Sequence, residues 1–235
     1  MGIGHLKRNW PIRVATVVLV ASTSGCASRD GVLRGQQCIA PDARLATIMR
    51  SLDQLHGSCM PDTTGQISCD RLQQELGRQA LLCPQHEPTL FVNAAFAYDM
   101  HRPTDAQEYL DIVLARRGSH PSAAILRSRI ATEDGNLPYA RRMLEEQVTL
   151  APDHAGLHEA LGGVLYLARN WTGAARELTK AGALGSPRWR IAYHLGLVEE
   201  AQGNVDNARR LYGESLQGNP QWSAAKSRLT GLPSQ

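Results

Sequence analysis

The segment LGLVEEAQGNVDNARRLYGESLQGNP, residues 195–220, decides the fold of this 235-residue chain, because its pattern recurs upstream at a fixed interval. Small residues stand at Gly196 and Ala208, and Tyr212 follows Ala208 by four positions. Steps of 34 residues back from these three reach residues of the same kind: Gly162, Ser128 and Ala94; Ala174, Ala140 and Ala106; Leu178, Leu144 and Leu110. A phase kept over more than a hundred residues predicts a tandem array of structural repeats.

Each repeat is expected to contain two helices joined by a turn. The pairs Gly135-Asn136, Arg169-Asn170 and Gly203-Asn204 hold the same phase and separate apolar stretches with helical spacing. A small residue on the first helix lets the second cross it closely, and Pro152 and Pro220 end second helices before the next unit begins. The sequence therefore predicts an all-α protein.

The last unit resembles the tetratricopeptide repeat (TPR) family in its spacing and in the placement of Leu195-Gly196, Ala208, Tyr212 and Pro220. The resemblance covers residues 87–222 as four tandem units. It implies a right-handed α-solenoid of helix-turn-helix units. We expect residues 223–235 to form a C-terminal capping helix and tail, because the last repeat otherwise exposes its stacking surface.

The resemblance also implies an inner, concave surface, lined by the first helix of each unit, that binds a peptide or helix segment of a protein partner. Tyr and Arg are enriched at binding hot spots. The candidate partner-binding residues are Tyr98, Arg129, Glu133, Glu159, Tyr166, Arg190, Tyr193 and Glu200. The alternative for each of them is packing against the neighbouring repeat. The clamp of chaperone-binding members on a peptide carboxylate is not expected, because the repeats and cap hold only Lys180 and Lys226.

Residues 42–86 are expected to form a cysteine-bridged helical hairpin. Two amphipathic stretches, 45–55 and 72–82, flank a turn-rich link at 61–65. The hairpin would bring Cys59 to Cys69 at its turn and Cys38 to Cys83 at its open end. We predict these two disulfides, each stabilising the fold by about 2–4 kcal/mol, although four cysteines allow three pairings. The hairpin could also be a degenerate fifth repeat.

Residues 1–25 have the pattern of an export signal. Three basic residues precede a short apolar run at 14–21, and small residues follow that run. Ser24-Gly25 before Cys26 resembles the lipobox of bacterial lipoproteins, although Thr23 stands where that family usually has Leu. The resemblance implies acyl chains, palmitate among them, on Cys26 and hence attachment to a membrane. The alternative is ordinary signal cleavage nearby, with Cys26 as a spare thiol.

The lipobox further implies a location. Residues 26–41 would be a lipidated linker, and Ala27 stands where an Asp would signal retention in the inner membrane. We therefore expect an outer-membrane lipoprotein of the bacterial envelope that faces the periplasm.

The net charge of +3 belongs to the expected export signal. Residues 1–25 hold three of the 25 basic residues and no acidic one, which leaves 22 basic and 22 acidic residues in the rest of the chain. Nucleic-acid binding depends on a strongly basic face. A neutral body therefore argues against DNA or RNA as a partner.

Catalytic and cofactor motifs are missing from the sequence, so we expect neither an enzyme nor a cofactor. No G-x-S-x-G motif and no glycine-rich phosphate loop occurs. His154 and His158 are four residues apart and could share a metal, but two ligands do not make a site, and no metal is expected. We expect both histidines on a helix surface.

Taken together, these features predict a scaffold that mediates protein–protein interactions in assembly of an envelope complex. The leading process is the assembly of a type IV pilus or secretion system, because lipoproteins that help pilus secretins reach the outer membrane resemble this architecture. The alternatives are an adaptor for a cell-wall enzyme, a polysaccharide-export scaffold and a small-ligand-binding module.

Overall fold

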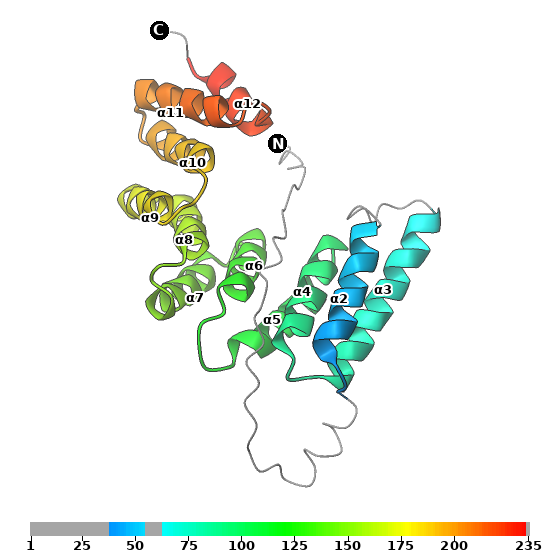
Figure 1. The fold of residues 1–235 in the computed structure, drawn as a ribbon. Coiled ribbons are helices and arrows are strands. Elements are labelled where there is room, and N and C mark those ends of the chain that lie inside the picture. Colours follow the sequence, from blue (N-terminus) through cyan, green and yellow to red (C-terminus); the bar gives the residue numbers. More distant parts are fainter. Residues whose placement is uncertain (1–37, 55–62, 234–235) are drawn as a thin grey trace.

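The computed structural model describes residues 38–54 and 63–233, which form helices with no β-strand among them (Figure 1). A helical hairpin is followed by four helix pairs and a last helix, so the protein is an all-α, right-handed α-solenoid, as predicted. The hairpin is α2 (Pro41–Gln54) and α3 (Thr63–Leu82). The pairs and last helix are α4 (Glu87–Asp99) and α5 (Pro103–Leu114), α6 (Pro121–Glu133) and α7 (Leu137–Leu150), α8 (Ala155–Leu167) and α9 (Trp171–Ala183), α10 (Arg188–Ala201) and α11 (Val205–Gly218), and α12 (Ser223–Gly231).

The first helices of the four pairs follow one another along the inner side of a curve (Figure 1). Successive first helices contact each other, and each also packs on the second helix of its own pair. The hairpin and α12 lie at the two ends of this curve.

The turn inside each pair has one residue with a left-handed backbone. These residues are 34 apart, namely His101, Gly135, Arg169 and Gly203, with φ values of 58°, 77°, 59° and 81°. Glycine adopts this conformation without steric cost, whereas His and Arg do not. The turn geometry is therefore imposed by the packing of the two helices at all four places.

The core is built from the residues that keep the 34-residue phase. Leu110, Leu144, Leu178 and Tyr212 are at most 1% exposed. Opposite them stand the small residues of the first helices. A Cβ atom added to Gly162 would lie 2.7 Å from Leu178 Cγ, and one added to Gly196 would lie 2.6 Å from a ring carbon of Tyr212. Small residues at these positions let the paired helices approach.

The hairpin has its own small core and is closed by a disulfide. Leu45 and Ile48 of α2 pack with Leu72 and Leu76 of α3 and with Phe96 of α4. The predicted bridge between Cys38 and Cys83 is confirmed, with Cα atoms 5.0 Å apart. Cys69 is fully buried and also disulfide-bonded. Cys26 and Cys59 lie outside the described residues, so lipidation and the pairing of Cys59 with Cys69 stay predictions.

One boundary of the hairpin differs from expectation. Residues 63–65, predicted as part of the turn, belong to α3, which begins at Thr63. A helix extends at little cost per residue once nucleated, so turn-prone residues at its start do not prevent it from forming.

The C-terminal helix closes the solenoid. Ala225 of α12 and Leu232 after it are buried, and Leu232 packs with Ala208 and Tyr212 of α11. The Trp222 ring lies 4.7 Å from that of Trp189. In the part of the chain that the structure describes, no helix is long and apolar enough to cross a membrane.

The close approach of α8 and α9 can be tested with two neighbouring glycines. Gly162→Ala should lower the free energy of unfolding by about 1–3 kcal/mol, because its Cβ atom would collide with Leu178. Gly163 has no atom within 4 Å of such a Cβ, so Gly163→Ala should raise the free energy of unfolding by up to about 1 kcal/mol through helix propensity. Denaturant unfolding measures both, and equal effects would contradict this packing.

The Cys38–Cys83 bridge closes a loop of 45 residues. Replacing both cysteines with serine should lower the free energy of unfolding by about 2–4 kcal/mol, because the unfolded chain regains entropy. Thermal unfolding with and without reductant measures the effect. The double variant should lose less stability on reduction than the unsubstituted protein does, and equal losses in both proteins would argue against the bridge.

Candidate functional site

The candidate site is the inner face, by which we mean the exposed sides of α4, α6, α8 and α10. All eight residues that the sequence singled out lie on these helices. Arg129 and Glu133 are exposed and the other six are half-buried. They are Tyr98 on α4, Arg129 and Glu133 on α6, Glu159 and Tyr166 on α8, and Arg190, Tyr193 and Glu200 on α10.

Glu159 is held by three side chains from the next repeat. Arg190 donates from Nε and Nη2 to its two oxygens at 2.5 and 2.7 Å, and Ser186 donates from Oγ at 2.9 Å. His194 Nε2 lies 3.6 Å from Glu159 Oε1. Burial by itself would raise the pKa of Glu159, but the interactions with His194 and Arg190 outweigh it and lower the pKa from 4.5 to about 2. The carboxylate therefore fastens α8 to α10.

Two further acids of the inner face accept hydrogen bonds across helix boundaries. The Tyr98 hydroxyl donates to Glu133 Oε1 at 2.5 Å and links α4 to α6. The Tyr212 hydroxyl donates to Glu200 Oε2 at 2.5 Å, and Arg228 of α12 donates to Glu200 Oε1 at 3.2 Å. Burial and the nearby Glu200 raise the pKa of Tyr212. All three candidate acids of the inner face thus join neighbouring helices.

The tyrosines are in part packing residues. The Tyr193 ring lies 5.8 Å from that of Trp222 and 5.9 Å from that of Tyr212, and burial raises the pKa of Tyr193. Tyr166 packs against Trp171 at 5.5 Å. Packing against a neighbouring element, the alternative left open by the sequence, therefore applies to Tyr193.

Arg129 is the candidate residue that stays most available. Its side chain is exposed and forms no hydrogen bond or ion pair within residues 38–54 and 63–233. A guanidinium group offers five N–H donors to carboxylate or carbonyl oxygens. The inner face can therefore bind a segment that presents hydrogen-bond acceptors near α6.

Sequence reasoning missed Ser186, His194, Trp222 and Arg228, which hold the inner face in shape. A signal was present, since Arg190 follows Glu159 by 31 residues, which is close to one repeat. A donor about one repeat after an acid on a first helix is therefore a signal for such a contact.

The histidines correct one prediction. His158 is not a surface residue but 1% exposed, and its ring nitrogens Nδ1 and Nε2 are hydrogen-bonded to Glu177 Oε2 at 2.7 Å and to the Pro152 carbonyl at 2.8 Å. Burial would raise the pKa of Glu177, but the bonds from His158 and Arg176 outweigh it and lower that pKa. His154 is half-buried and its ring accepts a hydrogen bond from the Leu157 N–H. No group of three or more possible metal ligands occurs in the described residues.

A second histidine pattern escaped the sequence analysis. The residues that precede α4, α6 and α8 as N-caps are His86, His120 and His154, again 34 residues apart. His86 contacts Asp42 at 3.0 Å and His120 contacts Glu87 at 2.9 Å. These two contacts add polar links between neighbouring elements at one edge of the solenoid.

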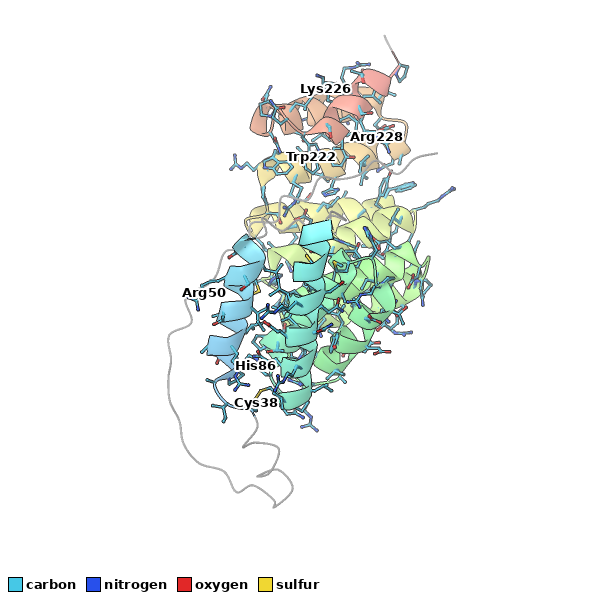
Figure 2. The ribbon with its side chains drawn as sticks, turned by 90° about the vertical axis from the view of Figure 1, so that its right-hand side faces the viewer. Cys38, Arg50, His86, Trp222, Lys226 and Arg228 are labelled. Atoms are coloured by element: carbon cyan, nitrogen blue, oxygen red, sulfur yellow. A yellow bond between two sulfur atoms is a disulfide. The ribbon has the colours of Figure 1, made fainter. Side chains whose placement is uncertain are left out.

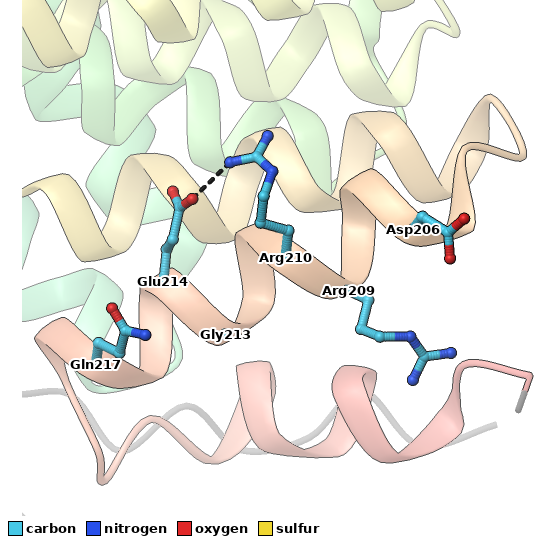
Figure 3. Close-up of a pocket in the computed structure, with 6 residues that line it drawn as sticks. All are labelled: Asp206, Arg209, Arg210, Gly213, Glu214 and Gln217. Carbon is cyan, nitrogen blue, oxygen red and sulfur yellow. Dashed lines mark hydrogen bonds and ion pairs between the residues drawn. The ribbon is translucent and has the colours of Figure 1, made fainter. Parts of the chain in front are cut away.

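A separate surface hollow lies along α11, away from the inner face (Figure 3). It is open to solvent and is lined by α11 residues, among them Gly213 and the ion pair of Arg210 with Glu214 at 2.5 Å. Ligand pockets are usually concave and mostly apolar. This hollow is lined mainly by charged and polar side chains and is open, so it does not resemble a ligand pocket.

Comparison with known proteins agrees with the repeat geometry. The sequence model of the tetratricopeptide repeat family matches residues 97–142 and 168–221. Residues 97–142 and 168–221 therefore have the sequence pattern of tetratricopeptide repeats. TPR domains are typically protein-interaction modules rather than enzymes. No curated protein sequence matches the chain.

Solved structures share the fold of this TPR protein. A thermophilic TPR protein of Thermus thermophilus is 20% identical, with 81% of this chain and 97% of that one covered and a TM-score of 0.61. PilF of Pseudomonas aeruginosa is 18% identical, with 82% and 81% covered and a TM-score of 0.62. YrrB, described as a TPR protein with an unusual peptide-binding site, is 10% identical, with 78% and 97% covered and a TM-score of 0.56. These likenesses establish the fold.

The half-buried carboxylate of Glu159 should make the free energy of unfolding depend on pH in the acidic range. Its pKa is about 2 in the folded protein and 4.5 as an ordinary carboxyl group, so its stabilisation is complete above about pH 4.5 and is lost as the pH falls toward 2. Glu159→Gln should lower the free energy of unfolding at pH 7 by on the order of 2 kcal/mol. Its free energy of unfolding should also fall less steeply than that of the unsubstituted protein as the pH drops from 4.5 toward 2.

Denaturant unfolding at a series of pH values between neutral and strongly acidic conditions measures this. Glu145→Gln is the matched control, because Glu145 is a half-exposed partner of Arg141 within one helix and surface pairs of this kind contribute little. If the free energy of unfolding of Glu159→Gln fell as steeply with acidic pH as that of the control, the assigned role of Glu159 would be contradicted.

Proposed function

We propose that this TPR protein is a membrane-anchored, periplasm-facing scaffold that binds a protein partner during assembly of a type IV pilus or secretion system in the bacterial envelope. The observation that carries the proposal is the inner face, a curved surface of four helices with half-buried tyrosines and with an arginine, Arg129, that forms no ion pair within residues 38–54 and 63–233. The likeness in fold to YrrB, which has a peptide-binding site, supports a peptide segment as the bound element.

Attachment to the membrane rests on Cys26. The lipobox-like Ser24-Gly25 before this cysteine supports acylation there and location at the outer membrane. The disulfides of the hairpin support an oxidising compartment such as the periplasm. Pilus assembly is supported by the similar fold of PilF over most of both chains.

The scaffold works by docking. Because Glu133, Glu159 and Glu200 are tied to neighbouring helices, the inner face is held in one shape before a partner arrives. A preformed surface loses less conformational entropy on binding than a mobile one. The partner supplies acceptor oxygens to Arg129 and apolar groups to Tyr166.

Capture of the partner tests this surface. Arg129→Glu reverses the charge of the available arginine and should reduce the partner recovered from detergent-solubilised envelope by roughly tenfold, as expected for a hot-spot residue. Arg142→Glu on α7 is the matched control, because Arg142 is an exposed arginine of the same repeat on the outer side. Quantitative mass spectrometry of the captured proteins gives the readout, and melting temperatures verify that both variants fold.

The identity of the captured protein decides between functions. Recovery of a secretin or another pilus component supports the proposal. Recovery of a peptidoglycan hydrolase or of a polysaccharide-export component would replace it with an adaptor or export scaffold. Equal capture by Arg129→Glu and Arg142→Glu would show that the inner face is not the binding surface.

A further inference from the structure

Two apolar side chains protrude at one end of the hairpin. Leu81, in the last turn of α3, is 84% exposed, and Ile39, just before α2, is 61% exposed. The other exposed large hydrophobic side chains among the described residues, Ile112, Leu150 and Leu167, are about half exposed. Ile39 and Leu81 therefore leave more apolar surface in water than any of these three.

The disulfide holds the backbone of these two residues in the same part of the molecule. Cys38 and Cys83 have Cα atoms 5.0 Å apart, and Gln79 Nε2 donates to the Pro41 carbonyl at 2.6 Å. Backbone geometry then limits the distance between the Cα atoms of Ile39 and Leu81 to about 14 Å. We call residues 38–44, 78–87 and 115–117 the disulfide end. Figure 2 shows Cys38 and His86 side by side there, with Arg50 farther along α2.

The disulfide end also carries cations without partners. Arg44, Arg78 and Arg117 are exposed and form no ion pair within the described part of the chain. Residue 117 belongs to this end because Arg116 donates to the Pro84 and Gln85 carbonyls at 2.9 Å.

The disulfide end holds more basic than acidic residues. Its acids are Asp42, which contacts His86 at 3.0 Å, and Glu87, which contacts His120 at 2.9 Å, and its arginines are Arg44, Arg78, Arg116 and Arg117. The charge of this end is therefore positive, which complements an anionic surface.

The length of chain before this end says which surface is within reach. Cys38 follows Cys26 by twelve positions, which span at most about 43 Å when fully extended. A protein held by acyl chains on Cys26 therefore keeps its disulfide end within that distance of the bilayer. Every other part of the solenoid is connected to the anchor through this end.

We propose that the disulfide end lies on the phospholipid surface, with Ile39 and Leu81 inserted among the headgroups and Arg44, Arg78 and Arg117 near lipid phosphates. This inference rests on the proposed acylation of Cys26, which supplies the anchor but not the contact. An apolar side chain beside basic ones is the pattern of interfacial membrane binding. The Cys38–Cys83 bridge keeps the backbone of Ile39 and that of Leu81 at the same end of the hairpin.

The contact would orient the array. In both views the disulfide end lies at the opposite extreme of the molecule from α12 (Figures 1 and 2). A solenoid resting on its disulfide end therefore projects its C-terminal repeats away from the membrane and leaves the inner face open to partners.

Fluorescence quenching by lipids with brominated acyl chains tests the contact. The acylated protein is reconstituted into vesicles of phosphatidylethanolamine and phosphatidylglycerol, and Leu81→Trp is compared with Leu167→Trp, an exposed control at the end of α8. The added emission of Leu81→Trp should fall by roughly half, because interfacial side chains reach the acyl boundary. The added emission of Leu167→Trp should stay unchanged. Quenching should weaken in vesicles of phosphatidylcholine alone.

Vesicle flotation separates this inference from the anchor on which it rests. Protein that floats with the vesicles and shows quenching only for Leu81→Trp supports the contact. Protein that floats while neither variant is quenched keeps the anchor and overturns the contact. Protein that does not float, with no acyl mass on Cys26, overturns the anchor and the contact with it.

Discussion

The close approach of the two helices in each repeat is the constraint on which the structure depends. At Gly162 and Gly196 the space of a missing side chain is filled by Leu178 and Tyr212 of the partner helix. The buried positions 34 residues apart repeat this contact along the chain. Because each unit packs only on its neighbours, an error in one contact would tilt every unit beyond it. The left-handed turns follow from the same contact, since two helices held this tightly leave the connecting residue few conformations.

This local character explains how much of the fold the sequence could predict. Small and large residues that face each other inside a unit are separated by a fixed number of positions, such as Gly162 and Leu178, so their phase is visible without a structure. The left-handed turns at His101 and Arg169 are less visible, because neither residue favours that conformation. The start of α3 at Thr63 was hidden for a related reason, since local turn propensity gave way to helix extension.

The inner face was predicted less completely, and the reason is geometric. Its residues could be placed on first helices from the register alone. Their partners could not, because contacts such as Glu159 to Arg190 join different repeats and depend on the angle between them. Burial of His158 was missed for a different reason, since its partner Glu177 lies on the second helix of the same unit and a polar pair of this kind does not recur in the 34-residue phase. The charge and hydrogen-bonding capacity of a residue did not by themselves reveal whether it holds two helices together or is available to a partner.

The paired acids change how recognition by the inner face should be understood. A surface acid that is free can be turned toward a partner, but Glu133, Glu159 and Glu200 are each held in place by a hydrogen bond from another helix. Breaking these bonds and leaving Arg190 or Tyr212 unsatisfied would be costly. The groups most available for specificity are therefore those with no hydrogen bond or ion pair in the described part of the chain, Arg129 foremost. The acids fix the curvature on which these groups are displayed, and the disulfide fixes the end of the array from which that curvature begins.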